Sequence, residues 1–304
     1  MRKIPVQQQK NKDKKQEISK IFCTRGNKYS SKFDISCSFV AIFTKSIRNM
    51  KLKRHDMGNG ITAFSTMRGT IAEGAYCGFN ITHYCGDSNE HVAECRRELC
   101  AMLGIDNEHL ILPRQTHEEK VVHIDREFLE RSPEEQKKIL HGVDAIVTRL
   151  RRVCIGVSSA DCVPLLLCDR RQRVIAAVHA GWRGTVRRIA EICAKEMIAR
   201  YACNPADIHA VIGPSIGLEA FEVGNEVCEA FSKAGFPMKQ VAALRAKWHI
   251  NLWEANRWLL MQCGIPNWNI KITGICTHTN HKEWFSARRL GINSGRIFNG
   301  IMIE

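Results

Sequence analysis

The sequence predicts an α/β fold (mixed α+β) that forms a single compact domain, with mixed β-sheets flanked by helices. From Ile61 onward, short β-rich runs alternate with segments of helical periodicity, and no long low-complexity segment interrupts them. Several runs are apolar and β-branched enough to be buried strands. The chain of 304 residues is 44% hydrophobic and 25% charged, which allows one sizeable core.

The individual elements follow from these patterns. Five runs predict strands, at residues 153–157, 163–167, 174–178, 208–212 and 270–275. Three segments have the periodicity of helices, at residues 92–103, 185–201 and 252–263. Asp87 or Ser88 caps the first helix and Asn251 the third, and Gly104 and Gly264 follow their ends.

The net charge of +14 is concentrated at the N-terminus. Residues 1–49 hold 12 Lys and Arg against 3 Asp and Glu, a net +9, which leaves +5 for the rest. The first twenty residues have too few apolar groups to fold. We therefore expect residues 1–49 to be a basic, disordered extension or a misassigned start, and residues 50–304 to form the globular domain. Because the charge is local, nucleic acid is not the expected partner.

Cysteine usage and hydropathy predict a cytoplasmic protein. Fourteen cysteines are spread over a large chain and no secretory signal precedes them, which favours reduced thiols. The longest apolar run near the start, residues 39–43, is far too short to span a bilayer. No membrane segment is expected.

The strongest local signal for chemistry is a predicted hairpin between Cys162 and His179. If its two strands were symmetric about Arg170 and Arg171, Cys162 and His179 would face each other across the hairpin. Opposed β-carbons lie roughly 5 Å apart, close enough for the two side chains to share a metal ion or to form a thiolate–imidazole pair. The alternative is that both are ordinary core residues.

Polar residues near the strand ends add candidates for anion binding. Asp161 precedes the cysteine, and Arg183 follows the histidine. The turn at residues 213–217, which contains Ser215, could offer backbone N–H groups to an anion. The sequence contains no G-x-x-x-x-G-K-[ST] phosphate loop, no strand-linked G-x-G-x-x-G and no C-x-x-C pair.

Eight motifs together resemble the YfiH-type laccase-domain family. In order, they span residues 115–117, 144–148, 160–164, 179–185, 212–217, 221–224, 276–277 and 285–289. The resemblance extends from about Phe64 to Ile303 and is highly specific.

The resemblance implies a zinc-dependent purine nucleoside phosphorylase that acts on adenosine, inosine and guanosine, deaminates adenosine and cleaves 5′-methylthioadenosine. It implies that one zinc ion is held by His117, Cys162 and His179, which are also the predicted catalytic residues. The partners would be purine nucleosides and inorganic phosphate, and a homodimer is possible. We expect the substrate and phosphate to contact five further residues: Arg68, Asp161, Arg183, Ser215 and Arg289.

The sequence departs from the family pattern near its start. Met67 stands where the family has an arginine in the S-T-R-x-G-G pattern, so Arg68 would have to take over any contact with phosphate. The older family label, multicopper laccase, predicts many histidines in H-x-H pairs, but this chain has 12 His and no H-x-H. Opportunistic Cu²⁺ binding still fits a His/Cys site.

Four alternatives stay open. The chain could be a metal-free cysteine hydrolase that uses Cys162 as nucleophile and His179 as base. It could be a copper-dependent polyphenol oxidoreductase, or a protein whose zinc is only structural. The non-enzymatic alternative is a basic nucleic-acid-binding or scaffold protein that acts through residues 1–49.

Overall fold

The computed structural model describes residues 50–69 and 74–304. The predicted N-terminal extension, residues 1–49, lies outside the described residues. The described part is a mixed α+β structure with parallel and antiparallel strand pairs, as predicted. Two of its sheets, which pack face to face, position the site.

The larger sheet has six strands in the order β13-β9-β7-β8-β5-β4. Their bounds are Ile270–Ile272, Ile208–Ile212, Val163–Asp169, Val174–Ala180, Ala145–Thr148 and Val121–Ile124. The second sheet has five strands in the order β1-β2-β14-β6-β3. Their bounds are Leu52–His55, Ile61–Thr66, Ile297–Ile303, Cys154–Ser159 and Leu110–Ile111.

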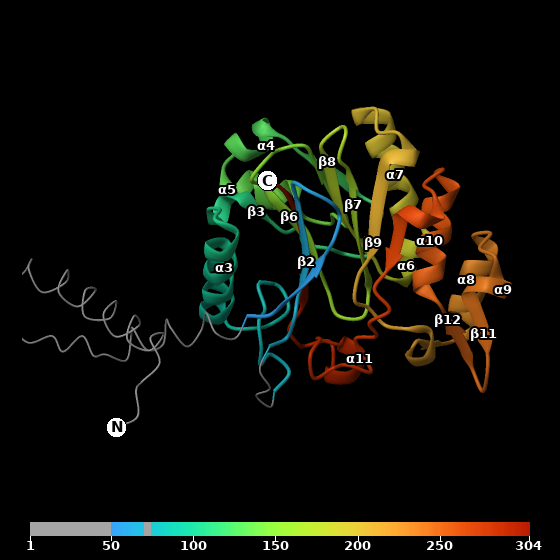
Figure 1. Ribbon diagram of the computed structural model, residues 1–304. Coiled ribbons are helices and arrows are strands. Elements are labelled where there is room, and N and C mark those ends of the chain that lie inside the picture. Colours follow the sequence, from blue (N-terminus) through green and yellow to red (C-terminus); the bar gives the residue numbers. More distant parts are fainter. Residues whose placement is uncertain (1–49, 70–73) are drawn as a thin grey trace, which may run out of the picture. The chain divides into compact units, whose positions relative to one another are not determined.

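A third, smaller sheet has the order β10-β12-β11, with bounds Glu222–Val223, Trp248–Ile250 and Ala242–Leu244. The α-helices of the described residues are α3 (Asn89–Leu103), α4 (Arg126–Glu130), α5 (Pro133–Ile139), α6 (Trp182–Val186), α7 (Ile189–Tyr201), α8 (Asn225–Lys233), α9 (Met238–Val241), α10 (Leu252–Gln262) and α11 (Ala287–Leu290). Helix α3 lies on the outer side of the five-stranded sheet, and α7 and α10 lie on the outer side of the six-stranded sheet (Figure 1).

The central strands β7 and β8 are largely apolar because both of their faces are covered. In β7, Leu165 and Leu167 pack towards the helices α7 and α10, whereas Leu166 and Cys168 pack against the five-stranded sheet. A strand buried in this way needs no polar alternation. The same alternation continues along β8, where Ala177 faces the inter-sheet core, so His179 lies on that face too.

The predicted helix ends are confirmed. The Ser88 hydroxyl accepts the N–H of His91 at 3.1 Å, and the Asn251 side chain accepts the N–H of Glu254 at 3.2 Å. Gly104 terminates α3 with a φ of 64°. These ends were predictable because a cap acts through residues that are close in sequence.

The single helix predicted over residues 185–201 is wrong: the structure contains two helices, α6 and α7. The chain breaks at Arg188, which has a φ of 65°. The guanidinium of Arg188 pairs with Glu191 and lies 5.2 Å from the ring centroid of Trp258. These contacts favour a change in the direction of the chain between α6 and α7, which helical periodicity alone does not reveal.

Candidate metal centre

The β7–β8 hairpin brings Cys162 and His179 onto one face, although in a different register from the predicted one. Pro164 is paired with His179 and Val163 with Ala180, so the pairing is shifted by two residues. Cys162 lies in the turn before β7, and the extended register places it opposite Gly181. An even shift preserves the face of every side chain, so the predicted proximity of Cys162 to His179 is confirmed.

Three potential ligands converge at this end of the hairpin. One ligand atom each from His117, Cys162 and His179 lies within 4.8 Å of the other two. The Cys162 Sγ is 3.7 Å from the His117 Nε2, and the two imidazole rings meet edge to face with centroids 4.9 Å apart. No other such group of three His, Cys, Asp or Glu residues occurs within the described ranges.

The spacing of these donor atoms fits a tetrahedral transition-metal ion. Zinc bonds of about 2.3 Å to sulfur and 2.0–2.1 Å to nitrogen place two ligand atoms roughly 3.6 Å apart. The 3.7 Å between Cys162 Sγ and His117 Nε2 is close to this value. Two imidazoles and a thiolate are also the donor types that zinc and copper prefer. The donor types and this distance therefore suit such an ion, and three protein ligands would leave a fourth position for water or substrate.

His117 reaches the cluster from a turn with unusual backbone geometry. Its φ is 66°, a left-handed conformation that is uncommon for residues other than glycine. Arg187 holds this turn from the outside, because its guanidinium donates to the His117 carbonyl at 3.2 Å and pairs with Glu118. Gln115 holds it from the inside, through hydrogen bonds of 2.7 and 2.8 Å to the backbone of Ser158 in β6.

Electrostatics within the cluster favour a charged thiolate. Burial alone would raise the pKa of the Cys162 thiol, but the positive charge of His179 and contacts with both histidines outweigh it and lower the pKa to about 6. Burial alone would lower the pKa of His179, but the Cys162 charge and the bond to Asp144 raise it to about 9. The metal-free cluster is thus a thiolate–imidazolium pair near neutral pH.

This pair predicts the pH dependence of thiol labelling in protein freed of metal by chelation. Alkylation of Cys162 by iodoacetamide should rise with pH through about 6 rather than about 9, because only the thiolate reacts. The same pair should add stability that is lost as pH falls through about 6, where the lowered thiol pKa lies, and again as pH rises through about 9, where the raised histidine pKa lies. Mass spectrometry of the labelled peptide measures the rate, and a midpoint near 9 would contradict the pair.

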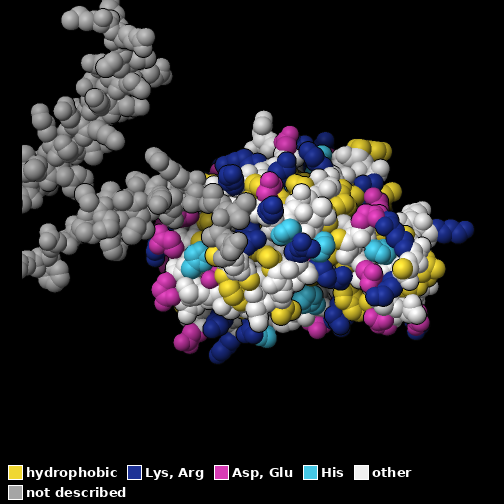
Figure 2. Space-filling model, turned by 90° about the horizontal axis from the view of Figure 1, so that it is seen from below, with side chains coloured by type: hydrophobic (Ala, Val, Ile, Leu, Met, Phe, Trp, Pro, Cys, Tyr) yellow, Lys and Arg dark blue, Asp and Glu magenta, His cyan; other side chains and the backbone are white. Residues whose placement is uncertain are grey.

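Two of the three arginines predicted to bind phosphate, Arg183 and Arg289, are exposed. Arg183 lies in α6 and stacks on Trp182, with 4.3 Å between the guanidinium carbon and the ring centroid. Arg289 lies in α11. Over the described part of the chain, neither guanidinium has an ion-pair or hydrogen-bond partner. Figure 2 shows the lower side of the molecule in Figure 1, where histidine side chains lie beside lysines and arginines and acidic side chains are also present.

Asp161 is held by residues that are remote in sequence. Its carboxylate accepts the Thr277 hydroxyl at 2.7 Å and the N–H of Arg288 at 2.7 Å, and its φ is 86°. Both carboxylate oxygens thus have partners. The residue fixes the Cys162 turn against the segment that carries Arg289.

The turn at residues 213–217 differs from the predicted anion-binding turn. Each of its four N–H groups is already bonded within the protein, to Pro164 O, Ile275 O, Asp161 O and Cys276 Sγ. The Ser215 side chain is fully buried, where its hydroxyl bonds the Gly213 carbonyl and accepts from the Trp253 indole. The structure therefore corrects the expectation that this turn, or Ser215, binds phosphate.

Arg68 also differs from the predicted phosphate contact. It is 7% exposed, and its guanidinium donates to the carbonyls of Cys77, His281 and Gly74. A guanidinium with three carbonyl partners ties segments together and is not free for an anion. Met67, at the family's arginine position, packs against the small core around Phe285.

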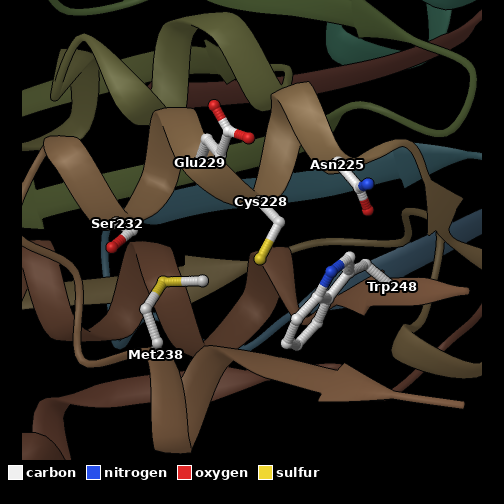
Figure 3. A pocket seen from close by; sticks show the side chains of 6 residues that line it. All are labelled: Asn225, Cys228, Glu229, Ser232, Met238 and Trp248. Carbon is white, nitrogen blue, oxygen red and sulfur yellow. The ribbon is translucent and has the colours of Figure 1, made fainter.

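A hollow of about 410 Å³ (Figure 3) shares no lining residue with the cluster of His117, Cys162 and His179. It is lined by Asn225, Cys228, Glu229, Ser232, Met238 and Trp248. The Cys228 sulfur points towards the Met238 and Trp248 side chains (Figure 3). Burial raises the pKa of this thiol, so the hollow offers no activated nucleophile.

The fold and the cluster together define a class: a mixed α+β protein of two packed sheets with a cluster of two histidines and one cysteine that could hold a metal ion. Comparison with known proteins identifies the family to which this chain belongs. Residues 61–304 match the family model described as multi-copper polyphenol oxidoreductase laccase, and the chain belongs to this family.

Among the similar proteins are a purine nucleoside phosphorylase and an adenosine deaminase. The chain is 43% identical over 267 residues to a purine nucleoside phosphorylase of Bacteroides thetaiotaomicron, covering 86% of this chain and 98% of the relative. It is 46% identical over 246 residues to adenosine deaminase RL5 of an unknown prokaryotic organism, covering 80% and 94%. The crystal structure of a Bacillus licheniformis hypothetical protein, YfiH, matches with a TM-score of 0.76 at 28% identity, covering 84% of this chain and 97% of that one.

These findings bear on two of the predictions from sequence. Membership of the laccase-type family confirms the predicted resemblance and implies metal binding. In the part of the chain that the structure describes, no helix is long and apolar enough to cross a membrane.

Proposed function

We propose that this chain is a zinc-dependent purine nucleoside phosphorylase that acts on adenosine, inosine and guanosine. We also propose that it deaminates adenosine and cleaves 5′-methylthioadenosine. The single observation that carries the proposal is the cluster of His117, Cys162 and His179, whose donor atoms lie within 4.8 Å of one another. The names of the two relatives above supply the substrate class.

The residues of the cluster would contribute to metal binding in different ways. Zinc bound there would supply Lewis acidity at an open coordination position. Cys162 contributes a charged thiolate, because its lowered pKa keeps it deprotonated near neutral pH. The Nδ1–H of His179 donates a hydrogen bond to Asp144 at 2.7 Å, which leaves the Nε2 lone pair for the ion.

Phosphorolysis requires a binding site for phosphate and charge stabilisation for the leaving base. In this reaction, a phosphate oxygen forms a bond to C1′ while the bond from C1′ to the purine nitrogen breaks and the purine takes up a proton. We assign phosphate binding to Arg183 and Arg289, whose exposed guanidinium groups have no protein partner among the described residues. In deamination, water adds at C6 of adenosine and ammonia leaves, and no phosphate is needed.

The test measures metal and products in the same preparation of the full chain. Elemental mass spectrometry should find about one zinc per chain after dialysis. Incubation of adenosine should release inosine without phosphate, and should release adenine together with ribose 1-phosphate when phosphate is present. No bound metal and no turnover would overturn the proposal, and the native metal being copper would correct it.

A metal-free cysteine hydrolase is the second candidate, because the lowered pKa of Cys162 also suits a nucleophile. Activity measured after chelation distinguishes the zinc enzyme from the metal-free cysteine hydrolase. Loss of activity on chelation, with recovery when zinc is returned, supports the zinc enzyme. Full activity of the stripped protein supports the hydrolase.

Two further parts of the proposal need other measurements. The cysteines from Cys85 to Cys276 are free thiols, which supports the expected cytoplasmic location, and cell fractionation would test it. The possible homodimer would be tested by light scattering. Removal of residues 1–49 should leave turnover unchanged if the extension has no catalytic role.

A further inference from the structure

Asp144 is a buried carboxylate behind the cluster that sequence reasoning assigned no role. It is 0% exposed and lies at the end of the loop that leads into β5. A buried carboxylate must be stabilised by hydrogen bonds or by a positive charge, because its desolvation costs several kcal/mol or more. The partners of Asp144 therefore show what it holds in place.

All hydrogen-bond partners of the Asp144 carboxylate belong to the two histidine ligands or their immediate neighbours. Its Oδ1 accepts from the His179 Nδ1 at 2.7 Å and from the backbone N–H of His117 at 3.1 Å. Its Oδ2 accepts the N–H groups of Thr116 and Glu118, at 3.1 and 2.9 Å. The carboxylate thus lies in a nest of three successive N–H groups and also contacts the second imidazole.

These contacts control different properties of the two ligands. On His179, the carboxylate can only accept, so Nδ1 must carry a proton, and Nε2 is the nitrogen left to bind a metal ion. On His117, the nest stabilises a left-handed backbone, with a φ of 66°, that would otherwise be strained. One side chain therefore sets the tautomer of one ligand and the position of the other.

We propose that Asp144 is the positioning residue that preforms the metal centre by fixing both histidine ligands. The inference rests on the proposed function, because it concerns the residues that would hold the zinc. It goes further by assigning metal affinity to a residue that touches neither metal nor substrate.

The test compares Asp144→Asn with Asp169→Asn. Asp169 is a matched control because it is also buried in the same sheet, at the far end of β7, where its Oδ1 accepts the N–H groups of Arg171 and Gln172. An asparagine at position 144 presents an N–H₂ group to at least one of the four donors. Zinc affinity, measured by competition with a chromophoric chelator, should fall about 10- to 100-fold in Asp144→Asn and stay within about threefold in Asp169→Asn.

A second measurement uses the wild-type protein, in case Asp144→Asn does not fold. The ¹⁵N shifts of the histidine rings in the zinc-loaded protein should show His179 protonated at Nδ1 and bound through Nε2. The reverse pattern, or equal zinc affinity of wild type and folded Asp144→Asn, would overturn this inference alone. Failure of the wild-type protein to bind zinc would overturn the proposed function together with it.

Discussion

Replacement of Cys162 by alanine should lower kcat/KM for adenosine phosphorolysis and deamination by at least about 10³-fold, because it removes the one anionic ligand of the cluster. Alanine leaves only His117 and His179, which are too few ligands to hold zinc tightly. The same variant should bind less than about a tenth of the wild-type zinc. Steady-state kinetics and elemental mass spectrometry on the same sample give both results.

The fold should survive this change, because Cys162 lies in a turn at the strand end and not within the hydrophobic core. Circular dichroism and thermal unfolding should therefore resemble the wild type measured without zinc. Cys263→Ala is the matched control: Cys263 is also partly exposed but ends α10, where burial raises its thiol pKa to about 11. An unfolded Cys162→Ala protein would indicate a structural zinc site, and an active one would remove Cys162 from the reaction.

The structure explains why local features were predictable and the register of the hairpin was not. Ser88 and Asn251 were identified as caps because each bonds an N–H group three residues along the chain. The β7–β8 turn contains four residues, and Arg173 takes a φ of 52° without a glycine or asparagine to signal it. The predicted pairing was wrong by two residues for this reason, yet the face of Cys162 and His179 was right because the shift was even.

The sequence revealed some residues of the candidate metal site and not others. The hairpin argument brought Cys162 to His179, whereas His117 entered only through the family resemblance. The phosphate-binding turn at residues 213–217 failed because its N–H groups bond partners such as Pro164 and Ile275 that are remote in sequence. Asp144 belongs to the family-like motif at residues 144–148, but its role depends on contacts with residues 26 to 35 positions away. Such contacts leave no periodicity in the sequence.

Gly181 is a second position at which one small change should disable the centre. A β-carbon added there would lie 2.9 Å from the His117 Cδ2 and 3.0 Å from the Cys162 Sγ. Its φ of −65° permits alanine, so the expected effect comes from these two contacts and not from backbone strain. Gly181→Ala should therefore separate two ligands by a few tenths of an ångström and lower kcat about 10²-fold, with weaker zinc binding, as measured by kinetics and chelator competition.

Gly184→Ala tests whether the effect is specific to the ligands. Gly184 is buried in the short helix α6, which Gly181 precedes, but an added β-carbon would meet Ile189 Cγ2 at 3.3 Å, and its other nearest neighbours lie at 3.6 Å or more. A flexible methyl group can move by the small distance required, so Gly184→Ala should retain zinc and most of the activity. If both variants lost activity equally, the cause would be distortion of α6. If Gly181→Ala kept wild-type zinc affinity and turnover, the ligands would have to be more mobile than a preformed centre allows, and the role of close packing around Cys162 and His117 would be refuted.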